Sequence, residues 1–116
     1  MDEPTFDRDG YPTQATLDEI SHWPFKRGLR RWLEFAAAAW DDTMGSFGPA
    51  RSRLPKRWRE DEEETWAAIT GGWSGNEDVV AAMRENWILW SMIWRVSVAG
   101  GYYEFGVDRG SHDSVS

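Results

Sequence analysis

Hydrophobic residues recur at helical spacing in three parts of the chain. Between residues 28 and 43 they lie three or four positions apart, which predicts a helix with one apolar face: Leu29, Trp32, Leu33, Ala36, Ala37 and Trp40. A shorter helix is predicted to start near Thr13 or Thr16 and to end before Pro24, because proline lacks the backbone N–H that a helix needs. A third is predicted over residues 76–87.

Beyond residue 87 the period changes to two, which predicts a strand over residues 90–98. Gly100 and Gly101 follow as a two-residue turn, and residues 102–107 complete a hairpin. This turn would pair Val98 with Tyr103, Val96 with Phe105, Trp94 with Val107 and Ser97 with Glu104. One face would then be apolar and the other polar. Residues 65–70 predict a further short strand.

These elements predict an α+β fold, with about three helices packed on an antiparallel sheet of about three strands that ends in a C-terminal β-hairpin. We expect one domain over residues 13–108, after an acidic lead-in at residues 1–12 and before a flexible tail at residues 109–116. Within the domain, residues 44–60 contain glycines, prolines and scattered arginines, which indicates a basic surface loop.

The composition excludes several classes of protein. The chain has 116 residues, which fits one domain, and its 41% of hydrophobic residues argues against disorder of the whole chain. It contains no cysteine, which excludes a disulfide scaffold and a thiolate metal site. No apolar run reaches the ~18 residues that span a membrane, and the first ten residues do not resemble a signal peptide. We therefore expect a cytoplasmic protein.

Tryptophan is unusually frequent, with nine residues. Six are predicted to pack in the core because of their spacing: Trp32, Trp40, Trp66, Trp87, Trp90 and Trp94. Trp23, Trp58 and Trp73 are predicted to be exposed. Exposed tryptophans are frequent in protein interfaces and also stack on ligands, so both a protein partner and a ligand remain open, as does a homodimer instead of a monomer.

The net charge of −7 conceals strong segregation. Residues 1–25 carry −5, residues 26–59 carry +6 and residues 60–116 carry −8. These segments either neutralise one another in the fold or form two patches of opposite sign for partners.

Candidate catalytic residues are few. His22 and His112 have no evident orienting partner, and no spacing of histidines and carboxylates indicates a metal site. Asp7-Arg8-Asp9-Gly10 resembles part of a calcium loop but lacks the distal ligands, so we interpret it as an exposed turn. We therefore expect no enzyme activity, no cofactor and no metal.

A glycine-rich loop at residues 71–75 leads into the third predicted helix. Such a loop offers backbone N–H groups to an anion. It has no lysine of the kind found in phosphate-binding loops, and Glu77 and Asp78 would repel a phosphate. The alternative is structural: glycines that permit positive φ, and a helix capped by Ser74 or Asn76.

Residues 70–77, TGGWSGNE, combined with Trp87, Trp90, Trp94 and the glycine hairpin, resemble small proteins encoded on bacteriophage genomes and in bacterial prophage regions. The segment FDRDGYPT near the N-terminus is similar to their opening. The resemblance implies an origin on a mobile element and transfers no catalytic residue.

The leading hypothesis is a small non-enzymatic inhibitor, of the anti-CRISPR kind, that blocks a bacterial nucleic-acid-handling protein complex. An acidic run would mimic DNA phosphates in a basic channel of the partner, and Trp58 and Trp73 would anchor the contact. The acidic residues are Glu60, Asp61, Glu62, Glu63 and Glu64.

The alternative hypothesis is a module that binds nucleic acid or a phosphorylated ligand through the basic segment 26–59 and the loop from Gly71 to Asn76. Its anion-binding residues would be Arg30, Arg31, Arg53, Lys56, Arg57, Gly72 and Ser74.

Overall fold

The computed structural model describes residues 1–59 and 62–108. The predicted tail at residues 109–116 lies outside the described residues. In chain order the elements are α1 (Gln14–Ser21), the 3-10 turn η1 (Phe25–Arg27), α2 (Leu29–Ala38), β1 (Ser46–Pro49), the 3-10 turn η2 (Lys56–Trp58), β2 (Glu63–Ile69), α3 (Ser74–Glu85), α4 (Trp87–Ile93), β3 (Trp94–Val98) and β4 (Tyr102–Asp108).

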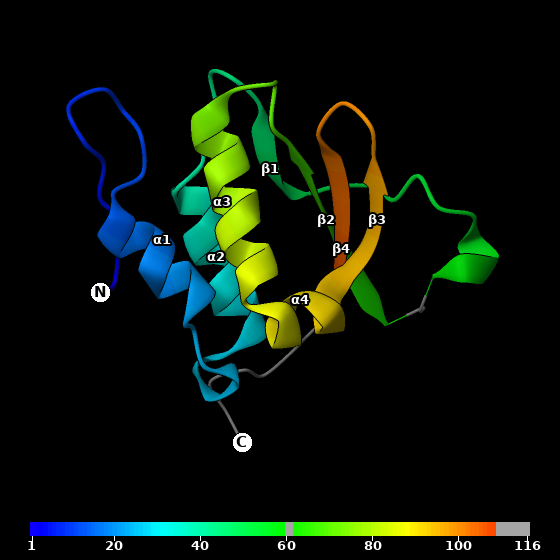
Figure 1. Cartoon of the computed structure of the whole chain (residues 1–116). Coiled ribbons are helices and arrows are strands. Elements are labelled where there is room, and N and C mark those ends of the chain that lie inside the picture. The colour runs from blue at the N-terminus through cyan, green and yellow to red at the C-terminus, as the bar shows by residue number, and fades with distance from the viewer. Residues whose placement is uncertain (60–61, 109–116) are drawn as a thin grey trace.

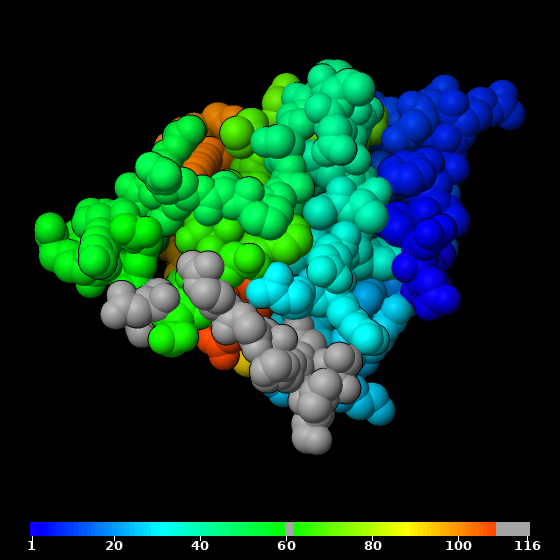
Figure 2. Space-filling model, turned by 180° about the vertical axis from the view of Figure 1, so that it is seen from behind, coloured from blue at the N-terminus to red at the C-terminus, as the bar shows by residue number. Residues whose placement is uncertain are grey.

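The fold is α+β, as predicted, and the described residues form a four-stranded antiparallel sheet of order β1-β2-β4-β3. Figure 1 shows α1, α2 and α3 grouped on one side of the molecule and the η2 turn projecting from the other. The view from behind in Figure 2 shows the same separation, with the N-terminal segment and the residues around η2 at opposite ends. The core lies between the helices and one face of the sheet.

Helix α2 confirms the clearest prediction, although it ends at Ala38 rather than near residue 43. Trp32 is fully buried at its centre, and its indole N–H donates to the carbonyl of Ile20 at 2.9 Å. Trp40, just beyond the helix, donates to the carbonyl of Ile69 at 3.1 Å. Tryptophan suits this core because each buried ring also has a partner for its N–H group.

The predicted helix starts are corrected in detail. Thr13, not Thr16, caps α1 by accepting from the backbone N–H of Thr16. Thr16 is buried and its hydroxyl accepts from the backbone N–H of Thr5 at 2.8 Å, which fastens the N-terminal segment to α1. Helix α3 has no side-chain cap, because Asn76 is buried and bonds elsewhere.

Strand β1 lies inside the predicted loop of residues 44–60 and brings the sheet to four strands rather than three. Its glycine and proline resemble a loop in composition. Pairing with β2 overrides that tendency, because Phe47 enters the core and contacts Trp40 and Phe105, with ring centroids 5.0 Å and 5.7 Å apart. Pro49 has no N–H to offer along the strand, which suits an edge strand.

Residues 87–93 form helix α4, so the prediction of a strand starting at residue 90 was wrong. The described residues therefore contain four α-helices instead of the three predicted. Leu89 and Ile93, four residues apart, are both buried, with exposed fractions of 1% and 0%. These residues fit a helical spacing and a strand-like period of two equally well. The helix forms because it places both Leu89 and Ile93 in the core.

The hairpin exists, but its predicted register was wrong. Strand β3 ends at Val98 and β4 starts at Tyr102, and these two residues are paired, so the turn comprises residues 99–101. The pairing shifts again at an irregularity between Trp94 and Val96. Glu104 therefore lies opposite Val96 instead of Ser97. Its side chain lies on a face of the sheet that other parts of the chain cover.

Candidate functional site

A strongly basic loop, residues 50–59, joins β1 to η2 and continues toward β2. We call it the projecting loop. Five of its side chains are basic and belong to exposed residues, and none of the five forms an ion pair with a residue in the described ranges 1–59 and 62–108: Arg51, Arg53, Lys56, Arg57 and Arg59. No ion pair within the described residues therefore offsets these five charges, although the charge of Arg53 also acts on the buried Glu104 carboxylate.

Trp58 ends the η2 turn within this loop and is 63% exposed. The Arg57 guanidinium lies 5.4 Å from its ring centroid. The prediction that Trp58 is exposed is confirmed. A large apolar ring is rarely left exposed among cations that have no ion-pair partner. This exposure favours contact of Trp58 with a partner.

A buried carboxylate holds the base of the projecting loop. Glu104, on the central strand β4, is 1% exposed. It accepts hydrogen bonds from the Ser52 hydroxyl at 2.6 Å, from the Arg53 backbone N–H at 2.7 Å and from the Tyr102 hydroxyl at 2.6 Å. A buried charge is tolerated when it is hydrogen-bonded in this way. The contacts with Ser52 and Arg53 join residues more than fifty positions apart in the chain.

The same contacts determine the ionisation of the cluster. Burial by itself would raise the pKa of Glu104, but the hydrogen bonds from Ser52, Tyr102 and Arg53, with the positive charge of Arg53, hold that pKa below its ordinary value. Burial and the neighbouring carboxylate raise the pKa of Tyr102 to about 12. Glu104 is therefore an anion and Tyr102 a neutral donor at neutral pH.

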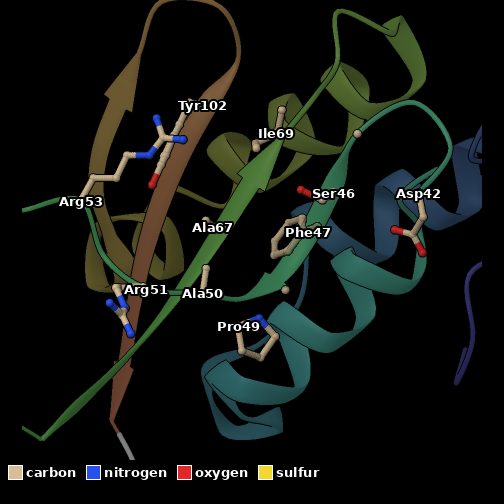
Figure 3. Close-up of a pocket in the computed structure, with 12 residues that line it drawn as sticks. Asp42, Ser46, Phe47, Pro49, Ala50, Arg51, Arg53, Ala67, Ile69 and Tyr102 are labelled. Carbon is tan, nitrogen blue, oxygen red and sulfur yellow. The ribbon is translucent and has the colours of Figure 1, made fainter.

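A shallow groove of about 400 Å³ lies between the projecting loop and the outer face of β1 and β2. Small residues, Gly48 and Ala67, leave room over the sheet, and half-exposed Ile69 adds apolar surface. Figure 3 shows Arg51 and Arg53 on the same side of the groove as Tyr102, with Asp42 on the opposite side. The Arg53 guanidinium stacks 4.2 Å from the Tyr102 ring centroid, so Arg51 is the cation with no such contact.

A second surface is apolar and belongs to α4 and the start of β3. We call the exposed residues Trp87, Ile88, Met92 and Trp94 the α4 surface. Their exposed fractions are 70%, 54%, 42% and 41%. Ile88 and Met92 are four residues apart and share one side of the helix, while Leu89 and Ile93 face the core. The prediction that Trp87 and Trp94 pack in the core was wrong.

The remaining tryptophan predictions divide. Trp23, predicted to be exposed, is buried, and its indole N–H donates to the Gly28 carbonyl at 3.2 Å. That prediction failed because the proline after it starts a 3-10 turn that folds back over the ring. Trp73 is half-buried against Tyr11, with ring centroids 4.7 Å apart. Much of its surface is therefore used inside the molecule.

The acidic run does not form one free patch. Glu60 and Asp61 lie outside the described residues, and Glu62 is exposed. Glu63 forms an ion pair with Arg95 at 2.5 Å. Its carboxyl group lies against Gly106, where a side chain on residue 106 would clash with it. Glu64 pairs with Arg30 at 2.6 Å and accepts from the Trp66 indole at 2.9 Å. Two of the five carboxylates thus form ion pairs at the start of β2.

The glycine-rich loop before α3 has a structural role in the described chain. Gly71 has a φ of +67°, and a Cβ there would lie 1.6 Å from the Met44 carbonyl oxygen. Asn76 is buried, accepts from the Asp41 backbone N–H at 2.9 Å and donates to the Thr70 carbonyl at 3.2 Å. The Ser74 hydroxyl lies 3.1 Å from the Tyr11 hydroxyl. These contacts join α3 to the end of α2 and to the N-terminal segment.

The predicted anion-binding residues are not gathered at one point. Arg30 binds Glu64 at the start of β2, whereas Gly72 and Ser74 follow the end of that strand. Arg31 is exposed on α2. Arg53, Lys56 and Arg57 belong to the projecting loop. Of this set, only the loop residues share one segment with an exposed aromatic ring.

Within residues 1–59 and 62–108, no group of three or more histidine, aspartate or glutamate side chains is placed to hold a metal ion. His22 ends α1, and its Nδ1 lies 2.9 Å from the Asp18 carbonyl oxygen. No helix in the described part is both long and apolar enough to cross a membrane.

Comparisons with protein-family models, with curated proteins and with solved structures find no match for this chain. The resemblance to bacteriophage and prophage proteins therefore stays a prediction.

Two features of these candidate surfaces were not predicted from the sequence. Simple alternation predicts that Glu104, between Tyr103 and Phe105, lies on the polar face of the hairpin, whereas its side chain is buried. A lone carboxylate in the middle of an aromatic strand is the signal that could have identified it. The α4 surface was missed because tryptophans at regular spacing were assumed to pack inward.

Proposed function

We propose that this protein is a small non-enzymatic binding protein that inhibits a bacterial nucleic-acid-handling protein complex, in the manner of an anti-CRISPR protein. The observation that carries the proposal of a protein partner is the α4 surface, where two tryptophans, an isoleucine and a methionine are exposed within residues 87–94. A concentration of exposed apolar side chains favours a protein contact, and tryptophan is enriched among the residues that dominate the energy of such contacts.

We propose that acidic residues contact the same protein partner as the α4 surface and do not bind it by themselves. Since Glu63 and Glu64 are engaged with Arg95 and Arg30, the phosphate-mimicking role rests on Glu60, Asp61 and Glu62 and on the acidic lead-in. Such charges accelerate association with a basic partner more than they add affinity. The inhibitory role and the bacterial cytoplasm come from the sequence resemblance, and the protein would act as a monomer or homodimer.

Phage infection of CRISPR-immune bacteria tests the proposal. The protein is expressed in a panel of strains whose CRISPR systems of different types target an infecting phage. We expect plaque formation to recover in at least one strain. The double variant Trp87→Ala and Met92→Ser should lose the effect, because it removes the centre of the α4 surface without touching the core.

A matched control is Phe25→Ala, which truncates a ring that is 59% exposed on a different element. It should retain full activity. Recovery in no strain of the panel would contradict the anti-CRISPR-like role, and full activity of the α4 double variant would contradict the assigned surface. Changing Glu60, Asp61 and Glu62 to their amides should slow association and weaken its salt dependence.

A second candidate function is nucleic-acid binding, and a specific observation favours it. The projecting loop presents five basic side chains with no ion-pair partner in the described ranges, together with exposed Trp58. A filter-binding assay with labelled DNA and RNA at low salt tests it, and no retention of either would exclude it.

A further inference from the structure

We infer that the projecting loop is a binding site for single-stranded nucleic acid, with Trp58 as the residue that stacks on a base. The inference rests on the second candidate function and is independent of the α4 surface. It narrows that candidate to one segment, the projecting loop (residues 50–59) with the adjoining groove, and to one class of ligand.

The first argument comes from the pairing of charge and ring. Phosphates alone would need only the cations, and a duplex hides the faces of its bases within the stack. A single strand offers both phosphates and free base faces, and proteins that bind it combine a basic track with exposed aromatic rings. Trp58 is 63% exposed with Arg57 beside it, and Lys56 and Arg59 flank the pair in sequence. This arrangement fits an unstacked base better than a duplex.

The second argument comes from the groove. Arg51 lines it with a guanidinium that has no partner in the described ranges, and Gly48 and Ala67 leave the sheet surface open beneath it. The groove and Trp58 belong to the same continuous loop, so a strand that stacks on Trp58 can extend a phosphate toward Arg51. Half-exposed Ile69 supplies apolar surface for the sugar or base above the groove.

The third argument comes from the anchor. A loop that projects from a small domain loses conformational entropy when it binds. Glu104 reduces that loss by fixing the backbone of Arg53 and the side chain of Ser52 before any ligand arrives. Glu104 is thus a positioning residue for this site, because it does not reach the ligand.

The acidic charge of the rest of the chain limits the expected affinity of the loop for nucleic acid. The chain has a net charge of −7, and exposed Glu62 follows the loop closely in sequence. At physiological salt, charges more than about 8 Å away are largely screened, so the local cations dominate at the loop itself. We therefore expect weak, strongly salt-dependent binding that strengthens when Glu62 is neutralised.

Fluorescence anisotropy with a labelled oligo-dT of about 12 nucleotides, at about 50 mM salt, tests the inference. We expect binding to the single strand at least ten-fold tighter than to a duplex of the same length. Trp58→Ala should weaken it about ten-fold, and Trp58→Phe much less. Arg57→Ala should reduce the salt slope by about 0.7, the value for one phosphate contact to a single strand.

Trp87→Ala is the matched control, since it removes an equally exposed tryptophan from the α4 surface. It should leave the single-strand affinity unchanged. Glu62→Gln should tighten nucleic-acid binding two- to three-fold. If Glu62→Gln weakens nucleic-acid binding instead, local charge does not govern the interaction and the loop site fails.

The remaining outcomes distinguish failure of the stacking site at Trp58 from failure of nucleic-acid binding as a whole. Equal affinity for duplex and single strand, or no effect of Trp58→Ala, overturns the stacking site while nucleic-acid binding itself survives. No binding of any nucleic acid at about 50 mM salt overturns both. Competition by poly-glutamate as effective as that by oligo-dT would assign the loop to an acidic protein and overturn the inference.

Discussion

The two faces of strand β4 are equally well buried but serve different purposes. Toward the helices, Phe105 is fully buried and lies 5.7 Å from the Phe47 ring and 5.4 Å from the Trp90 ring. On the other face Glu104 is 1% exposed, and its carboxylate has three hydrogen-bond donors. The aromatic face stabilises the fold by removing apolar area from water, whereas the carboxylate face determines where the projecting loop lies.

The difference teaches that burial alone does not reveal what a position contributes. Apolar contacts are non-directional, so neighbours of similar volume can replace one another with modest loss. A buried carboxylate is directional, and each donor must reach it at the correct angle. The aromatic face therefore tolerates conservative change, and the carboxylate face specifies one arrangement of the loop.

The largest effect should come from the aromatic face. Phe105→Ala is expected to lower the free energy of unfolding by about 3–5 kcal/mol, because it removes a ring from the centre of the core and leaves a cavity. Urea denaturation followed by tryptophan fluorescence measures it. Phe105→Leu should cost less than half as much, and equal losses for the two variants would contradict a tolerant apolar face.

A smaller but more specific effect is expected from the carboxylate face. Glu104→Ala should cost about 2–3 kcal/mol, because the Ser52 hydroxyl, the Tyr102 hydroxyl and the Arg53 N–H lose their common acceptor. It should also free the projecting loop, which limited proteolysis after Arg53 or Arg57 would detect. The surface variant Glu62→Gln should change stability by less than about 0.5 kcal/mol. Resistance of the Glu104→Ala loop to protease would contradict the anchoring role.

Acid should reproduce part of this loss without mutation. The folded pKa of Glu104 lies below the value of 4.5 for a free glutamate, so the unfolded chain binds the proton more readily. The stabilisation is complete above that value and is lost as the pH falls through the folded pKa. Glu104→Gln should lack this component. The difference between wild type and variant, measured by urea denaturation at several pH values, isolates Glu104 from other carboxylates such as Glu19.

The smallest effect should separate two ion pairs. Arg95→Gln should cost about 1 kcal/mol, because the Glu63 side chain is only 9% exposed. Arg27→Gln should cost about 0.5 kcal/mol or less, because its pair with Glu19 is open to water, with side chains 34% and 25% exposed. Thermal unfolding at low and high salt checks both values. A larger salt dependence for Arg95 than for Arg27 would contradict this order.

Local patterns in the sequence were sufficient for much of the fold. The amphipathic spacing around Trp32, the proline that ends α1 and the glycines before α3 each act over a few residues. They predicted the α+β class, the positions of α1, α2 and α3 and the existence of the C-terminal hairpin. Charge segregation and an exposed Trp58 in a basic loop were also evident from the sequence alone.

Only the tertiary structure decided which patterned residues face inward. Strand β1 forms because Phe47 packs against Phe105. Trp87 stays exposed because Leu89 and Ile93 occupy the side of the short helix α4 that faces the core. The anchor at Glu104 depends on Ser52, 52 residues earlier in the chain. Pairings over such distances follow from how the elements close around one core, and the order of residues within one element does not contain that information.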